Sequence, residues 1–184
     1  MMKKWLIPLG IIVLLGVMLV SGYNNLVTIS EGVNGSWSQV QNQLQRRADL
    51  IPNLVETVKG YASQEKEVFT AVAEARAKLN GAKTVGDAAQ ADQALTGALG
   101  RLLAISESYP QLKSDANFRA LQDELAGTEN RIATARMDYN NTVQSYNTKI
   151  KTFPTSIYAG IIGFGQRDYF KPNANVNNVP AVKF

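Results

Sequence analysis

The chain has 184 residues, of which 45% are hydrophobic and 18% are charged, and its formal net charge at pH 7 is +4. It contains no histidine and no cysteine, which excludes Ser-His-Asp triads, histidine-based zinc and di-iron motifs, disulfides and thiol nucleophiles. We therefore expect no metal, no other cofactor and no catalytic residue. Nucleic-acid binding is not expected either, because no helix carries a basic face interleaved with aromatic residues.

An uncharged apolar run, residues 5–20, lies near the N-terminus. As a helix it spans roughly 24 Å, slightly less than the ~30 Å of a bilayer's hydrocarbon core. Trp5 and Tyr23 flank the run, at the depth where amphipathic rings favour the membrane interface. We predict that residues 1–22 form a retained membrane anchor whose residues 5–20 contact the lipid bilayer. A signal peptide cleaved before Tyr23 is the alternative.

The direction of insertion follows from the positive charges around this run. Lys3 and Lys4 precede it, and no lysine or arginine follows until Arg46. Cytoplasmic flanks carry the excess of basic residues. The sequence therefore predicts a single-pass protein with its N-terminus in the cytoplasm and its body outside.

The first long helical pattern begins at Trp37. Apolar residues recur there at steps of mainly three and four, which indicates one buried helical stripe. The stripe consists of Trp37, Val40, Leu44, Ala48, Ile51, Val55, Val58, Ala62, Phe69, Val72 and Leu79. Because it crosses Pro52 without losing phase, we expect a kinked continuous helix at the proline, with a chain reversal as the alternative. Asn80 and Gly81 are expected to end this helix.

Two further stripes follow. The second comprises Ala88, Ala91, Leu95, Leu99, Leu102 and Ile105, with Asp87 as a plausible N-cap and an end at Tyr109, before Pro110. Ser114 or Asp115 is expected to cap the third, which holds its spacing from Phe118 to Phe153 and so favours long, nearly antiparallel helices.

No segment alternates as a strand would. The predicted fold is all-α: an N-terminal transmembrane helix followed by an antiparallel bundle of three to four long helices. The expected divisions are an anchor at 1–22, a bundle at 23–165 and an irregular tail at 166–184.

Two polar clusters interrupt the stripes, and they are the candidate interaction or structural ion-pair sites. One has Arg46, Arg47, Asp49, Pro52 and Asn53, and the other has Glu129, Arg131 and Arg136. The favoured interpretation is packing, in which Arg46 and Arg47 pair with Glu124 or Glu129 and penalise wrong helix registers. The alternative is a notch at the proline kink that binds a partner or a lipid headgroup.

A glycine-rich segment, residues 160–165, follows the third stripe. It lacks the preceding strand and the following Lys-Ser/Thr of a phosphate-binding loop. We interpret it as an apolar patch suited to docking onto the bundle, a partner or a membrane surface.

Several motifs resemble the LemA family of bacterial membrane proteins. They are "YNNLV" at 23–27, "QLQRRADLIPNLVETVKGYASQEKE" within 37–67, "YPQLKSDANFRALQDELAGTENRIATARMDYNNTVQSYN" at 109–147, "FPTSI" at 153–157 and "YF" at 169–170. The resemblance runs nearly end to end and implies one N-terminal membrane segment, a helical bundle and no agreed enzymatic activity. Many relatives have His-Glu where this chain has Gln64-Glu65, which argues against a family-wide metal or proton role at that position in this chain.

The resulting hypothesis is a non-enzymatic, membrane-anchored scaffold or adaptor of the bacterial cell envelope. It would act by association with other envelope proteins or with itself, without nucleic acid or metal. A ligand- or lipid-headgroup-binding sensor using Arg46, Arg47 and Pro52 is the alternative. Descriptions of the family often place the bundle in the cytoplasm, but the N-terminal lysines favour a periplasmic bundle at the inner membrane.

Overall fold

The computed structural model describes residues 3–171, with side chains described from residue 8 onward. This part of the chain is all-α, as the sequence predicted: it holds six helices and no strand. The helices are α1 (Lys3–Lys59), α2 (Lys66–Asn80), α3 (Val85–Ser108), α4 (Pro110–Ser114), α5 (Ala116–Lys151) and α6 (Thr155–Tyr158).

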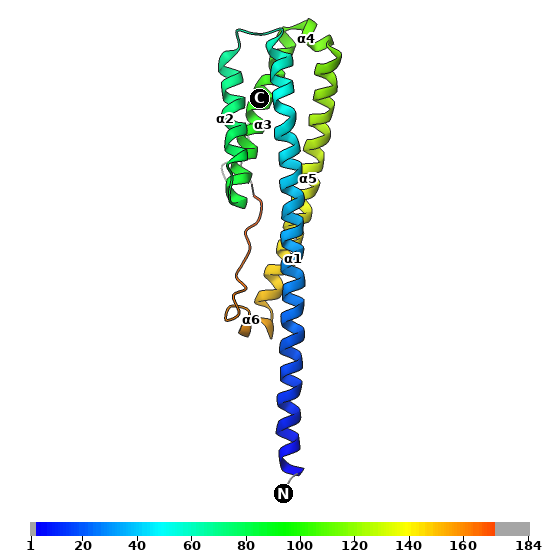
Figure 1. Cartoon of the computed structure of the whole chain (residues 1–184), viewed down its shortest axis with the longest axis vertical. Coiled ribbons are helices and arrows are strands. Elements are labelled where there is room, and N and C mark those ends of the chain that lie inside the picture. Colours follow the sequence, from blue (N-terminus) through cyan, green and yellow to red (C-terminus); the bar gives the residue numbers. More distant parts are fainter. Residues whose placement is uncertain (1–2, 172–184) are drawn as a thin grey trace, which may run out of the picture.

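Helix α1 continues without a break from an exposed apolar part into the bundle. The side chains of residues 8–21 in its apolar N-terminal part are exposed. This part is long and apolar enough to cross a membrane, and it extends beyond the other helices (Figure 1). From Leu26 onward one side of the same helix is buried in the bundle, through Val33 and Val40 to Val58. At ~1.5 Å per residue, 57 helical residues measure about 86 Å. One continuous helix therefore contains both the expected anchor and a part of the bundle.

The chain reverses after Lys59 and not at Pro52. Pro52 lies inside α1, so the continuous helix expected there is present. The helix expected to run on to Leu79 is instead divided, because residues 60–65 form turns before α2 begins at Lys66. Gly60 weakens helix propensity at this point, and Ala62 is still fully buried. The apolar phase therefore continues across a turn that periodicity alone does not reveal.

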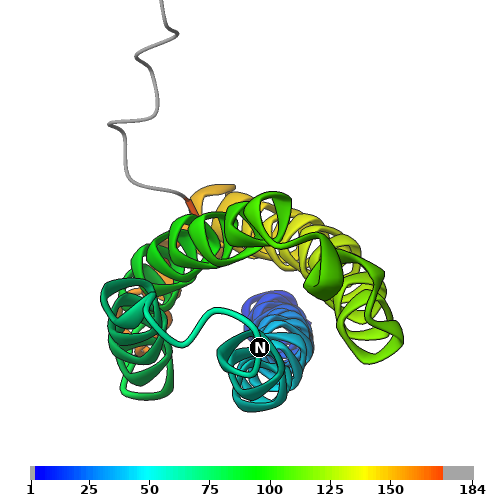
Figure 2. The ribbon, with the colours of Figure 1, turned by 90° about the horizontal axis from the view of Figure 1, so that it is seen from above.

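The four longer helices run alternately up and down. Helix α1 packs along α5, α2 pairs with α3, and α4 sits at the top corner between α3 and α5 (Figure 1). Seen along the axis, α1 lies inside the arc made by the other helices (Figure 2). The α2–α3 hairpin is shorter than the α1–α5 pair and covers only its upper part.

Side-chain caps fix two of the helix starts. Thr84 and Asp87 form a reciprocal capping box at the start of α3, so the N-cap is Thr84 and not Asp87 as expected. Asp115 caps α5 by accepting a hydrogen bond from the Phe118 backbone N–H at 2.9 Å, in agreement with the sequence. The same carboxylate accepts a bond from the Tyr61 hydroxyl at 3.0 Å, which ties the α1–α2 turn to the α4–α5 corner.

Below the α2–α3 hairpin, an extended segment packs against α1 and α5 where the hairpin is absent. We call residues 165–171 the strap; they follow α6 and rise along α5 in the antiparallel direction. Phe170 of the strap is buried, and its ring lies 6.3 Å from that of Trp37 on α1. The strap thus completes the core where only two long helices are present.

Candidate functional site

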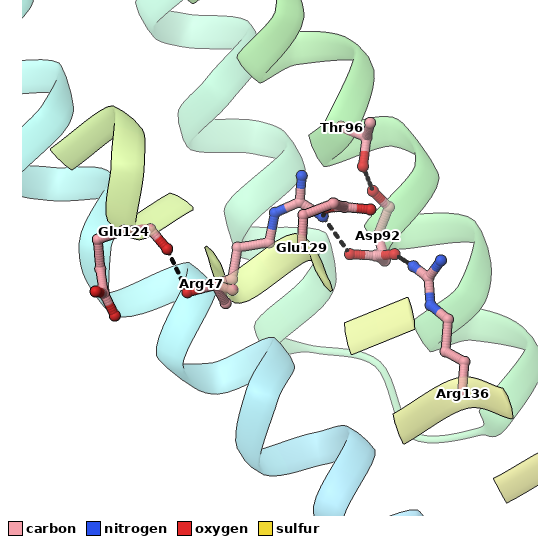
Figure 3. A network of polar contacts seen from close by, with 7 residues as sticks. Arg47, Asp92, Thr96, Glu124, Glu129 and Arg136 are labelled. Carbon is pink, nitrogen blue, oxygen red and sulfur yellow. Dashed lines mark hydrogen bonds and ion pairs between the residues drawn. The ribbon is translucent and has the colours of Figure 1, made fainter. Parts of the chain in front are cut away.

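A buried ion-pair network joins three helices near the middle of the bundle. The Arg47 Nη1 atom of α1 lies 2.8 Å from Asp92 Oδ1 of α3 and 2.8 Å from Glu129 Oε2 of α5. Arg136 of α5 pairs with the other oxygen of Asp92. Figure 3 shows Asp92 between the two guanidinium groups, with Thr96 donating to the Asp92 backbone carbonyl at 3.0 Å.

Burial sets the electrostatics of this network. Asp92 is fully buried, and Arg47 is 5% exposed. Burial lowers the pKa of Arg47, while the negative charge of Glu129 opposes that shift. Burial also lowers the pKa of Arg136, and the positive charge of Arg47 adds to the effect. Both guanidiniums stay charged at neutral pH, so two cations balance two carboxylates.

Such a network favours one helix arrangement more than it adds stability. Its Coulomb attraction is largely offset by the desolvation of the four ions, whereas removal of one partner leaves a buried charge uncompensated. Arg47 has contacts on α3 and α5 at once. A slip in the register of any one of the three helices would therefore break at least one pair.

The predicted cluster around Arg46 divides into a buried part and an exposed part. Arg46 donates to Glu124 Oε1 through Nε at 3.0 Å and Nη2 at 2.5 Å, with about half of its side chain exposed. Arg131 lies 3.6 Å from the same carboxylate oxygen. Arg46 is paired with Glu124 and Arg47 with Glu129, the two acids of α5 that the packing interpretation named without assigning them to either arginine.

The other residues of this cluster face solvent. Asp49 accepts a hydrogen bond from the Gln45 side chain at 2.8 Å, one turn earlier on α1. Pro52 and Asn53 are exposed. The structure does not bring these three residues into the buried network.

The backbone group freed by Pro52 has a partner within the bundle. Proline lacks the N–H that would donate to the carbonyl four residues earlier, which belongs to the fully buried Ala48. Arg76 of α2 donates to this oxygen through Nε at 2.8 Å. The proline therefore creates an acceptor on α1, and α2 docks on it.

Two Tyr-Asn dipeptides of α5, one heptad apart, hold the strap. Asn147 exchanges two hydrogen bonds with the Arg167 backbone, both at 2.9 Å. Asn140 does the same with the Phe170 backbone, at 2.8 and 3.0 Å. The hydroxyls of Tyr139 and Tyr146 donate to the carbonyls of residues 168 and 165.

The spacing of these clamps follows from backbone geometry. Seven helical residues rise about 10.5 Å, and three extended residues cover about 10 Å. Successive Tyr-Asn pairs on one face of α5 therefore meet strap positions three residues apart. The side chains supply the hydrogen bonds that an extended segment outside a sheet would otherwise lack. Arg136 connects the strap to the ion-pair network, because its guanidinium lies 4.7 Å from the centre of the Phe170 ring.

Two surface clefts lie beside these groups. One, of about 500 Å³, lies between α3 and α5, and its lining includes Arg47, Glu129, Thr96, Leu103 and Ala126. The other, of about 420 Å³, lies between α1 and α5 and is lined by polar residues that include Arg131. Within residues 3–171 no three acidic, histidine or cysteine side chains gather as a metal site.

Sequence reasoning missed Asp92 and the strap clamps. Asp92 follows Ala88 by four residues and precedes Leu95 by three, so it lies on the apolar face of its helix. A charge at a core position is the signal that a buried pair exists. The signal for the strap was the repeated Tyr-Asn dipeptide at heptad spacing.

Comparison with known proteins gives the same family as these motifs. The model of the LemA family matches residues 36–184. Magnetosome protein MamQ 2 of Paramagnetospirillum magneticum is 31% identical, covering 81% of this chain and 64% of its own length. Protein LemA of Metamycoplasma hominis is 26% identical, covering 74% of this chain and 63% of its own length. The chain thus spans less than two thirds of these curated relatives. It belongs to the LemA family.

Proposed function

We propose that this membrane-associated envelope protein is a non-enzymatic scaffold or adaptor that acts by association with itself or with other envelope proteins. The observation that carries the proposal is the continuity of α1. One helix contains the apolar run and the central face of the bundle, so the bundle is held at a fixed distance from the membrane. A presenting surface needs this property.

The chemistry of the core supports the same proposal. Arg47, Asp92, Glu129 and Arg136 are paired with one another. Acid–base catalysis requires a titrating group within reach of a substrate, and these four side chains are engaged across three helices.

The cleft between α3 and α5 is the surface that we assign to association. Apolar residues of both helices line it, among them Leu99, Leu103 and Leu125, together with polar residues such as Gln122 and Asp123. Grooves of this kind accept an amphipathic helix through anchors three or four residues apart.

The alternative sensor at the proline kink has less support from the geometry. Its arginine, Arg47, is already paired on two sides, and the freed Ala48 carbonyl already accepts from Arg76. Arg46 is the one basic group there with substantial exposure. A sensor would bind its ligand through Arg46, with Arg47 as support.

Single cysteines test the association, since the natural chain has none. Thr96→Cys and Ala126→Cys introduce thiols at exposed positions of the cleft. Treatment of intact membranes with a short bismaleimide should give an adduct with a second copy, or with one other protein, at these positions. Thr70→Cys on α2, also exposed, is the matched control and should give none. Efficient maleimide labelling without adducts at either cleft position would refute the association through this surface.

A further inference from the structure

Exposed apolar side chains gather where α5 turns into α6. Phe153, Ile157 and Ile161 are 81%, 63% and 84% exposed, and Ile162 is 41% exposed. The first three are spaced four residues apart, and Ile157 lies on α6. Val17 in the apolar run of α1 is 63% exposed. We call Phe153, Ile157, Ile161 and Ile162 the apolar corner. Three of its four side chains are at least as exposed as Val17 in the apolar run.

Contacts with α1 show which part of that helix lies beside the apolar corner. A Cβ atom on Gly22 would collide with the Tyr158 hydroxyl at the end of α6, so α6 lies directly against α1 there. Next to it, the rings of Tyr23 and Phe164 meet edge to face with centroids 6.0 Å apart. Gly22 and Tyr23 follow the apolar run, residues 5–20, with Ser21 between. In Figure 1, α6 accordingly lies at the end of the bundle nearest to that run.

The charges that adjoin the corner are basic. Lys149 and Lys151 end α5 just before Phe153, and no acidic residue lies between residues 139 and 167. Lys151 is exposed, and Lys149 is partly exposed. Basic groups beside an exposed apolar surface favour binding to a bilayer, because they pair with its anionic lipid phosphates.

From these three observations we propose that the apolar corner enters the interface of the same membrane that α1 crosses. Phe153, Ile157 and Ile161 insert among the headgroups and upper acyl chains, while the nearby lysines pair with lipid phosphates. The bundle then rests on the membrane at two points, α1 and the corner, and cannot swivel about α1. The inference depends on the membrane anchorage of the proposed function.

Spin labels on single cysteines test the position of the corner. The full chain is reconstituted in vesicles of three parts phosphatidylethanolamine to one part phosphatidylglycerol, with a nitroxide at Ile157→Cys or Ile161→Cys. Collisions with oxygen report the bilayer, and collisions with a water-soluble nickel chelate report solvent. Val17→Cys is the control for the bilayer and Thr70→Cys the control for solvent. All four positions are exposed, so labelling should leave the fold intact.

We expect the oxygen-to-nickel ratio at both corner positions to lie several-fold above that at Thr70 and towards that at Val17. A solvent-like ratio at the corner with a bilayer-like ratio at Val17 would overturn the inference and leave the anchor intact. A solvent-like ratio at Val17 as well would overturn the anchorage itself. Low collision rates with both reagents at the corner would show that a second copy or another protein covers it, and would also overturn the inference.

Discussion

At the scale of the residue, two adjacent arginines have opposite surroundings. Arg47 is buried among carboxylates from α3 and α5, whereas about half of the Arg46 side chain is exposed. We predict that Arg47→Ala lowers the free energy of unfolding by about 3–5 kcal/mol, because it removes one of the two cations that pair with the fully buried Asp92. Arg46→Ala should cost less than ~1 kcal/mol. Denaturant unfolding of the full chain in detergent, followed by circular dichroism, measures both.

A third variant separates charge from packing. Arg47→Met keeps a long side chain in the space but removes the cation that faces Asp92 and Glu129. We expect it to be nearly as unstable as Arg47→Ala, because the loss comes from removing a cation that pairs with the buried Asp92. A native-like stability of Arg47→Met would mean that Arg47 contributes by volume and that its ion pairs are dispensable.

Still at this scale, the Asn147 clamp makes a prediction about the strap. Trypsin cleaves after Arg167, whose N–H and C=O are both bonded to the Asn147 side chain. Asn147→Ala removes both bonds, each worth about 1 kcal/mol. Cleavage at Arg167 should then accelerate roughly thirtyfold, because the strap opens more often. Limited proteolysis with mass spectrometry locates the cut.

Asn141→Ala is the matched control for the clamp, since Asn141 is an exposed asparagine of the same helix. Its cleavage rate at Arg167 should match that of the natural chain. Equal rates for Asn147→Ala and Asn141→Ala would show that the clamp does not hold the strap closed.

At the scale of the element, Pro52 and Arg76 form a pair that couples two helices. Arg76→Met keeps the apolar stem but removes the donor to Ala48, which should cost about 1–3 kcal/mol. Pro52→Ala restores the backbone N–H that the same carbonyl lacks. We therefore expect Arg76→Met to cost clearly less in the Pro52→Ala background. The four unfolding free energies form a double-mutant cycle, and additivity within ~0.5 kcal/mol would contradict the coupling.

The same elements show what periodicity can and cannot predict. Spacing of three and four residues identified the stripes of the bundle because each long helix buries one face. It did not reveal the reversal at residues 60–65, since buried Ala62 keeps the phase through the turn. It did not reveal the strap, because an extended segment fixed by side chains of α5 has no period of its own.

The ion pairs could likewise be predicted only in part from the sequence. Pairing of Arg46 and Arg47 with acids of α5 could be predicted, because the acids recur near the stripe of a long neighbouring helix. The partner on α3, Asp92, could not be assigned in that way. Which short helix packs beside which long one depends on the lengths of the turns, and those were misread at residues 60–65.

At the scale of the whole molecule, the sidedness of the bundle follows from the sidedness of α1. The helix passes from the apolar run into the core without a break, so the bundle emerges wherever the C-terminal end of the run emerges. Because Lys3 and Lys4 precede the run, we propose that this end lies outside the cytoplasm. We predict that Thr70→Cys, exposed on α2, reacts with a membrane-impermeant maleimide in intact spheroplasts.

Moving the charges should move the bundle. With Lys3→Gln, Lys4→Gln, Asn24→Lys and Asn25→Lys combined, the basic residues follow the run instead of preceding it, and orientation tracks such charges close to the span. The labelled fraction of Thr70→Cys should then fall in intact spheroplasts and recover after permeabilisation. If the natural charge pattern already gives labelling only after permeabilisation, the bundle faces the cytoplasm. The cleft between α3 and α5 would then have to associate with cytoplasmic partners.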